Sequence, residues 1–432
     1  MRPFFRPFLV VASLAASVAF ASEGHADPSA PVVLGLAVIL LVAKLAGDVA
    51  VRVGQPAVLG ELLAGVVLGN LPLLGVHTFE PMAASPFLDM FARVGVIVLL
   101  FEVGLESTVA QMMKVGLSAL LVAIIGVALP FALGFATTRL VLPGHPMTVA
   151  LFIGATLTAT SVGITARVLK DLERSQTPEA RVILGAAVID DVLGLVILAV
   201  VTGVIVASDA GGSLAVSDVL LTVGKAVGFL MGALVLGTRL SKRLFGLASL
   251  LKVRGVLLAF ALGIAFLSSA LADFIGLAPI VGAFAAGLVL EDVQYQDLVD
   301  REHHSLEELI HPIAGFLVPV FFVLMGMHTQ LTSFAQPGVL GLAAALCLVA
   351  VVGKLASGLG VRGSAGASRL TVGIGMVPRG EVGLIFADLG SKLMTHGEPV
   401  VSPEVFSAVV AMVIVTTRVT PPALEWSMRR SA

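Results

Sequence analysis

Two adjacent acids interrupt a long apolar stretch, Ala186-Ala187-Val188-Ile189-Asp190-Asp191-Val192-Leu193-Gly194. The stretch lies in an apolar segment, 181–207, that is long enough to cross the roughly 30 Å hydrocarbon core of a bilayer as an α-helix. An ionisable side chain at the centre of such a helix costs about 2.5–3.5 kcal/mol to insert, which indicates a functional site. Neighbouring side chains on a helix point about 100° apart, so the two carboxylates can have different partners.

The composition places the rest of the chain in a membrane as well. Hydrophobic residues make up 58% of the 432 residues and charged residues 12%, whereas soluble domains carry about a quarter charged residues. No segment alternates with the period of a membrane β-barrel strand, so we expect an all-α membrane protein. We do not expect an enzyme. The thirteen predicted spans are 31–51, 56–72, 90–106, 115–138, 147–169, 181–207, 216–238, 253–272, 276–290, 311–328, 337–360, 369–390 and 403–425.

The first 21 residues resemble a cleavable signal peptide. Arg2 and Arg6 precede an apolar run, Pro7 to Phe20, that is shorter than the later ones and ends in a small-x-small pattern. A retained extra helix is the alternative. Residues 22–432 are expected to form a single transmembrane domain.

The basic residues of the loops predict the orientation of the chain, because cytoplasmic loops are enriched in lysine and arginine. One set of loops contains only Arg139 and Lys392. The opposite set, with the C-terminus, contains Arg52, Lys114, Arg167, Lys170, Arg174, Arg181, Arg239, Lys242, Arg243, Lys252, Arg254, Arg301, Arg362, Arg369, Arg429 and Arg430. We therefore expect an outside N-terminus and a cytoplasmic C-terminus in a bacterial inner membrane.

A lysine provides the buried acids with a counter-ion. Lys354 lies far from either end of the segment 337–360, and one of the two aspartates is its natural partner. A buried pair of this kind can exchange protons near physiological pH. A purely structural salt bridge is the alternative reading for Lys354. A single lysine cannot neutralise both aspartates, which favours a functional role for Asp191.

Two predicted spans are interrupted at membrane depth. The fifth contains the polar and β-branched stretch Thr156 to Thr165, and the twelfth contains Pro378 within a glycine-rich stretch, Gly373 to Gly383. Irregular backbone is tolerated at this depth where it lines a cavity or is buried in protein. Interruptions at corresponding positions of two halves indicate a transporter's binding site. The two spans are seven apart, and this odd offset predicts inverted repeats of spans four to six and eleven to thirteen.

These motifs resemble those of the cation:proton antiporter-2 family and, within it, the NapA-like sodium/proton antiporters. The resemblance covers the whole membrane domain in span count and order. It rests on Thr158-Ala159-Thr160-Ser161-Val162-Gly163-Ile164, Val188-Ile189-Asp190-Asp191, Gly353-Lys354 and Pro378-Arg379-Gly380-Glu381-Val382-Gly383.

The resemblance implies a homodimer with two crossed broken helices in a moving core, about residues 115–207 and 337–425, and a scaffold of the remaining helices. It also implies that Asp191 is the main carboxylate for sodium and protons. Asp190 would belong to the same ion-binding site and pair with Lys354, which would act as a proton carrier. Thr160 and Ser161 would supply oxygens to the cation. Pro378, Arg379 and Glu381 would support the broken helix.

The implied activity is an electrogenic, alternating-access exchange of Na⁺ or Li⁺ for H⁺. We expect no cofactor and no nucleic-acid partner, and we expect membrane lipid to surround the protein. A potassium/proton antiporter is the nearest alternative, because carboxylates and hydroxyls do not by themselves select one alkali ion. A cation channel and a sodium-coupled solute symporter are the other classes considered.

The charge asymmetry of the loops leads to a topology prediction. Alkaline phosphatase folds to an active enzyme only outside the cytoplasm, so a fusion at residue 432 should be inactive and one shortly after Ala21 active. An active fusion at residue 432 would contradict the orientation.

Overall fold

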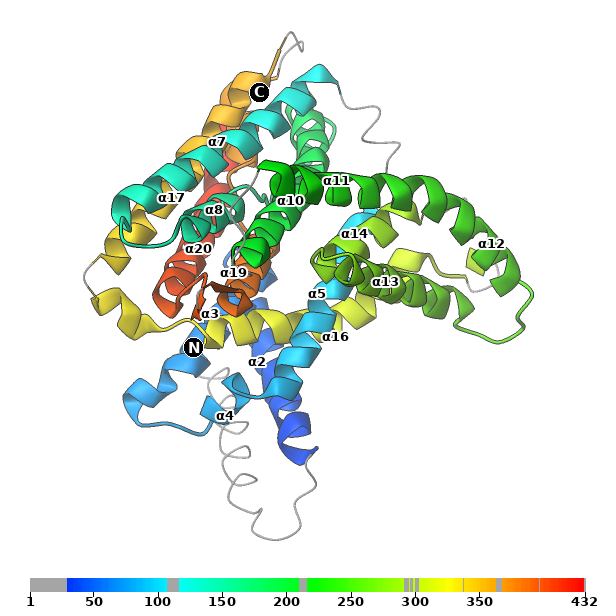
Figure 1. The fold of residues 1–432 in the computed structure, drawn as a ribbon, viewed down its shortest axis with the longest axis horizontal. Helices are drawn as coiled ribbons and strands as arrows, with labels where there is room; N and C mark the ends of the chain where they lie inside the picture. The colour runs from blue at the N-terminus through cyan, green and yellow to red at the C-terminus, as the bar shows by residue number, and fades with distance from the viewer. Residues whose placement is uncertain are drawn as a thin grey trace. The chain divides into compact units, whose positions relative to one another are not determined.

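The computed structural model describes residues 29–106, 116–209, 216–290, 295, 298–299, 303–336, 338–362, 367–395 and 397–430. Helices dominate these ranges (Figure 1), and the strands found there are two short ones that pair antiparallel, β1 (Met394–Thr395) and β2 (Glu398–Pro399). Nine helical segments of the described chain are long and apolar enough to cross a membrane. The helical membrane fold is thus confirmed, whereas the count of thirteen spans stays a prediction. The predicted signal peptide lies outside the described residues.

The chain divides into two compact units. The first contains the described residues up to Val96 together with Ile313–Ser333, and the second contains Ile97–Pro312 with Phe334 onward. Both predicted core segments fall in the second unit, together with the helices between residues 216 and 290. The boundary between these two units is not the boundary predicted between core and scaffold. The core and scaffold division therefore stays a proposal.

Glycines join the helices of the first unit. A Cβ at Gly65 would lie 2.1 Å from the carbonyl oxygen of Val323, and one at Gly326 would lie 2.2 Å from that of Leu62, so the two backbones are in direct contact. Small residues permit this close approach in membrane helices. The elements of this unit are α2 (Ala30–Arg52), α3 (Ala57–Asn70), η1 (Leu71–Leu74), α4 (Glu80–Ala83), the start of α5 (Pro86–Glu106), most of α16 (Leu306–Met327) and part of η4 (Leu331–Ala335).

The second unit contains the two acids and both interrupted spans. Its first part comprises the end of α5, α7 (Leu117–Val141), α8 (Met147–Thr156), α9 (Val162–Asp171), α10 (Pro178–Asp209), α11 (Val216–Gly232), η2 (Ala233–Gly237), α12 (Thr238–Ala248), α13 (Val256–Phe274) and α14 (Pro279–Val289). Its second part comprises α17 (Val339–Leu355), η5 (Ala356–Gly360), α18 (Arg369–Gly375), α19 (Glu381–Lys392) and α20 (Pro403–Arg430). Within it α7 packs against α8, α10 and α17, and α17 packs against α20 (Figure 1).

Many helix ends differ by a few residues from their predicted positions, and α20 extends five residues beyond its predicted end at 425. Two of the differences involve identifiable local structure. The segment predicted to end at residue 238 continues through the π-helical turn η2 into α12. The span predicted to begin at His311 begins at Leu306. The reason is a capping box: the Glu308 amide donates to Ser305 Oγ at 3.2 Å, and the Ser305 amide donates to Glu308 Oε2 at 3.1 Å.

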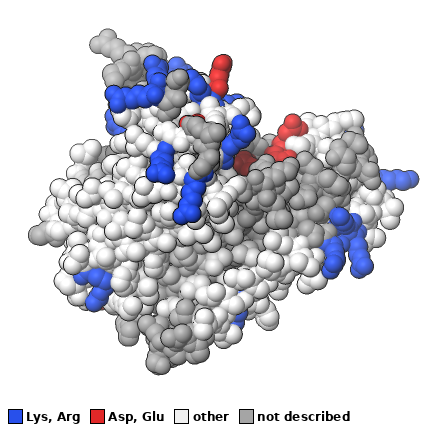
Figure 2. Space-filling view, turned by 90° about the horizontal axis from the view of Figure 1, so that it is seen from above, with Lys and Arg blue, Asp and Glu red and all other residues white. Residues whose placement is uncertain are grey.

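Much of the molecular surface carries no charge. Most of the face drawn in Figure 2 is occupied by uncharged residues, with the Lys and Arg side chains in a few separate groups. Large apolar side chains are exposed along the helices, including Leu267 at 72% and Phe274 at 87% on α13. Contiguous exposed apolar area of this kind suits a lipid environment better than water.

Candidate functional site

A buried ion pair joins α10 and α17. Lys354 Nζ lies 2.6 Å from Asp190 Oδ1, and neither side chain is exposed to solvent. The helix α7 covers the pair at Gly126, where a Cβ would lie 3.6 Å from Lys354 Nζ and 3.7 Å from Asp190 Oδ1. Ser357 donates from Oγ to the Lys354 carbonyl at 2.6 Å. The pair is therefore enclosed by three helices.

The two aspartates have different surroundings. Asp191 is 7% exposed, and no group of the described chain donates a hydrogen bond to its carboxylate. The charges of Asp190, Glu381, Lys354 and Glu106 lie near enough to act on it. Asp190 holds a cation directly, whereas Asp191 has charged neighbours and no bonded partner.

The first interruption separates α8 from α9 at residues 157–161. Two threonine hydroxyls there bond back to the preceding turn: Thr156 Oγ1 donates to the Phe152 carbonyl at 2.9 Å, and Thr158 Oγ1 donates to the Ala155 carbonyl at 2.7 Å. Such local bonds compete with the helical ladder and favour its termination. The threonine-rich sequence thus favours the break, although the same kind of bond occurs within continuous helices such as α20.

The second interruption separates α18 from α19 at residues 376–380. Pro378 cannot donate a backbone hydrogen bond and would clash with the preceding turn of a continuous helix. Gly380 is required by the packing, because a Cβ there would lie 2.5 Å from Ser161 Oγ. Proline and glycine therefore end one helix and allow close contact with the other interruption.

The two interruptions bond to each other. The Ser161 amide donates to the Pro378 carbonyl at 2.8 Å, and Thr165 Oγ1 donates to the Gly375 carbonyl at 2.7 Å. Thr160 Oγ1 makes a longer contact of 3.4 Å with the Met376 carbonyl. Each break thus supplies donors or acceptors to backbone groups that the other leaves without a helical partner.

The contacts between the two interruptions and their flanking residues, 157–165 and 375–381, form a junction. Two ionisable side chains of the twelfth predicted span take part in it. Arg379 is fully buried and donates from Nη1 to the Ala159 carbonyl. Its own carbonyl accepts a hydrogen bond from Thr417 Oγ1 of α20. Glu381 begins α19 and accepts a hydrogen bond from Ser161 Oγ at 2.9 Å.

The junction packs along α10 on the side that contains Asp190. A Cβ at Gly194 would lie 3.6 Å from Thr158 Oγ1, and a Cβ at Gly375 would lie 2.5 Å from Ile183 Cδ1. Residues 183, 190 and 194 share one face of the helix, because they are spaced by seven and four. The structure therefore brings the Asp190–Lys354 pair and both breaks together.

All the site residues expected from the sequence lie in this region, while their roles in ion binding stay proposals. Sequence reasoning missed Gly126, Thr165, Ser357 and Thr417. Gly126 stands in an apolar helix with no motif around it, and Ser357 follows the Gly353-Lys354 motif without belonging to it. The threonines belong to polar positions of broken or terminal spans and could have been singled out only as possible donors to freed carbonyl groups.

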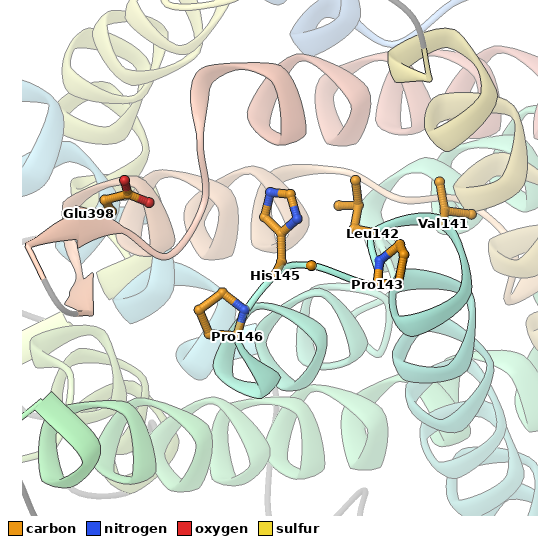
Figure 3. Close-up of a pocket in the computed structure, with 7 residues that line it drawn as sticks. Val141, Leu142, Pro143, His145, Pro146 and Glu398 are labelled. Atoms are coloured by element: carbon orange, nitrogen blue, oxygen red, sulfur yellow. The ribbon is translucent and has the colours of Figure 1, made fainter.

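A separate hollow lies between the α7–α8 loop and β2. His145 and Glu398 are its ionisable lining residues (Figure 3). The ten residues of α8, about 15 Å of helix, separate this loop from the first interruption. Among the described residues, no group of three or more His, Cys, Asp or Glu side chains could hold a resident metal ion.

Comparison with known proteins gives a consistent result. The family model described as "Sodium/hydrogen exchanger, transmembrane" matches residues 37–430. A relative in Synechocystis, the high-affinity Na⁺/H⁺ antiporter NhaS3, is 38% identical, with 92% of this chain and 89% of that protein covered. The Na⁺/H⁺-K⁺ antiporter GerN of Bacillus cereus is 36% identical, with 91% and 95% covered.

A solved structure supports the fold. The sodium proton antiporter MjNhaP1 from Methanocaldococcus jannaschii superposes with a TM-score of 0.64 over 92% of this chain and 96% of that one. The two sequences are 17% identical, so this likeness bears on the fold alone.

The contact between Gly380 and Ser161 leads to a prediction on stability. Gly380→Ala should destabilise the protein by about 1–3 kcal/mol, because the added Cβ overlaps the serine and must force the two breaks apart. Gly383→Ala is the matched control, since its Cβ would make an ordinary contact of 3.6 Å with Val413. Thermal unfolding in detergent measures both variants, and an equal effect would contradict the packing at the junction.

Proposed function

Since the chain belongs to the sodium/hydrogen exchanger family, we propose that it is a secondary-active antiporter that exchanges Na⁺ for H⁺ across a membrane. The observation that carries this function is a buried Asp190–Lys354 pair beside an unpartnered Asp191 and two bonded helix interruptions. The relatives named above are antiporters and not channels, which favours coupled exchange over a continuous pore.

Asp191 carries the exchanged ion. An ionised carboxylate without a bonded partner attracts a small cation, and protonation of the same carboxylate releases it. Thr160 and Ser161 supply hydroxyl oxygens within the first interruption, and hard cations prefer oxygen ligands. Competition between Na⁺ or Li⁺ and H⁺ at one carboxylate is sufficient for coupled exchange, with no cofactor.

The Asp190–Lys354 pair carries a second proton. When Na⁺ occupies Asp191, the Lys354 ammonium loses a proton, and it regains the proton after the cation has left. Two protons then cross for one sodium, and the exchange moves one net charge per cycle. Support for this step comes from the contact of 2.6 Å in a site without solvent.

The interrupted helices move with the bound ion. Bonds between the two breaks make the polypeptide around residues 157–165 and 375–381 a single mechanical element. Inverted repeats and crossed broken helices would let this element shift between inward-open and outward-open populations. The protein would act as a homodimer in a bacterial inner membrane, with its N-terminus outside and its C-terminus in the cytoplasm.

Potassium/proton exchange is the second candidate. The name of the GerN relative includes K⁺ as well as Na⁺, and the carboxylate and hydroxyl groups of this site do not exclude the larger ion. Proteoliposomes with an imposed pH gradient distinguish the two, because a sodium antiporter should respond to Na⁺ and Li⁺ far more strongly than to K⁺. A response to K⁺ alone would overturn the sodium assignment.

Asp191→Asn should abolish exchange while the protein still folds. The amide keeps the shape of the carboxylate but cannot alternate between a charged and a neutral form. The matched control is Asp273→Asn, an exposed aspartate at the end of α13. Cation-dependent proton flux in proteoliposomes measures both variants; substantial antiport by Asp191→Asn at saturating Na⁺ would exclude the proposed role.

Lys354→Gln should make the exchange independent of membrane potential. In the wild type, one net charge per cycle shifts the balancing sodium ratio tenfold for each ~59 mV. The variant should lose this shift and unfold at a lower temperature, because removing one partner of a buried ion pair destabilises the fold, by up to about 3–5 kcal/mol.

The readout for Lys354→Gln is the sodium gradient that stops net flux at fixed pH gradient and varied potential. Lys252→Gln, at an exposed lysine, should behave as the wild type. A balancing gradient in Lys354→Gln that still follows the potential would show that this lysine carries no transported proton.

A further inference from the structure

Arg379 has more hydrogen-bonding capacity than its contacts use. The side chain is fully buried, and only Nη1 donates to a partner, the Ala159 carbonyl. Its Nε and Nη2 atoms have no hydrogen-bond partner in the described structure. A buried guanidinium with two unused donors is costly, so a second acceptor is expected in another state of the molecule.

Asp190 has the complementary vacancy. Lys354 occupies its Oδ1 atom, and its Oδ2 atom is buried with no hydrogen-bond partner. The charges of Arg379 and Asp190 interact, which places the two groups in one electrostatic environment. The Arg379 side chain donates to the carbonyl of Ala159, the residue after Thr158. The Thr158 hydroxyl in turn lies beside α10 at Gly194, one helical turn after Asp190.

We propose that Arg379 is the alternate counter-ion of Asp190 and holds this carboxylate ionised when Lys354 is neutral. This inference rests on the proposed function, in which Lys354 releases a proton while sodium is bound. The proton leaves the ammonium for water on the open side of the protein, Asp190 stays a carboxylate, and the charge of Arg379 does not change. Arg379 is thus a positioning residue that allows Lys354 to give up its proton.

The physical reason is the cost of an unpaired charge. If Lys354 became neutral beside an Asp190 with no other cation, the buried carboxylate would retain the proton, and the second proton would never leave. A permanently charged guanidinium removes this obstacle, because arginine is not deprotonated in proteins. Lysine and arginine therefore have different tasks on the same carboxylate.

The test compares reversal potentials in proteoliposomes. Arg379→Gln should still exchange sodium for protons, but its balancing sodium gradient should no longer follow the membrane potential, although Lys354 is present. Arg379→Lys should restore the dependence on potential only at pH values that keep this side chain charged. The control Arg418→Gln, at an exposed arginine of α20, should match the wild type. A structural role of Arg379 would slow transport and leave the dependence on potential unchanged, which would overturn the proposal.

Thermal unfolding provides a second measurement that does not depend on stoichiometry. Each of Lys354→Gln and Arg379→Gln leaves Asp190 with one cation, whereas the double variant leaves none. The double variant should therefore lose more in melting temperature than the sum of the two single losses, and adding Asp190→Asn should recover the excess. An additive loss, or no recovery with Asp190→Asn, would overturn the shared counter-ion.

The two measurements separate the possible failures. A wild-type balancing gradient that ignores the potential would refute the two-proton exchange, and the unfolding series would then decide whether Arg379 and Lys354 share Asp190. A dependence on potential in the wild type that persists in Arg379→Gln would refute the inference alone.

Discussion

The cost of placing ions away from water is the constraint on which this structure depends. Lys354 and Asp190 are excluded from solvent, so each must keep a partner, and their contact fixes α10 and α17 against each other. The third helix, α7, packs over the pair at Gly126, where a Cβ would be in ordinary contact with both charged groups and in a tighter contact of 3.3 Å with Ser357. The geometry of the centre therefore follows from one ion pair enclosed by closely packed helices.

Backbone polarity imposes the second constraint. A helix broken at membrane depth leaves amides and carbonyls that lipid cannot satisfy. Here the Ser161 amide bonds to the Pro378 carbonyl, and Thr165 bonds to the Gly375 carbonyl, so segments more than 200 residues apart in the chain complete each other. Each break therefore depends on the other for part of its hydrogen bonding.

The sequence predicts the helical class and the positions of both interruptions because these depend on composition, proline and glycine. Helix ends proved harder, since the capping box at Ser305 and Glu308 and the π-helical turn at 233–237 are local features that hydropathy does not detect. The side-chain bonds of Arg379 and Thr165 were out of reach, because each joins residues 210 to 220 positions apart. A pattern in one chain contains no information on such a contact until the helices are placed.

Adjacent positions on a helix explain why two acids in one sequence motif need not share a task. The face of α10 that contains Asp190 also contains Ile183 and Gly194, which pack on α18 and the first interruption. Asp191, about 100° away, leaves this face and has no bonded cation among the described residues. A carboxylate that is paired with a fixed cation stays ionised. A carboxylate without such a partner can be neutralised by a mobile cation or a proton. The division between a permanent anion and an exchangeable site can thus arise from the helical repeat itself.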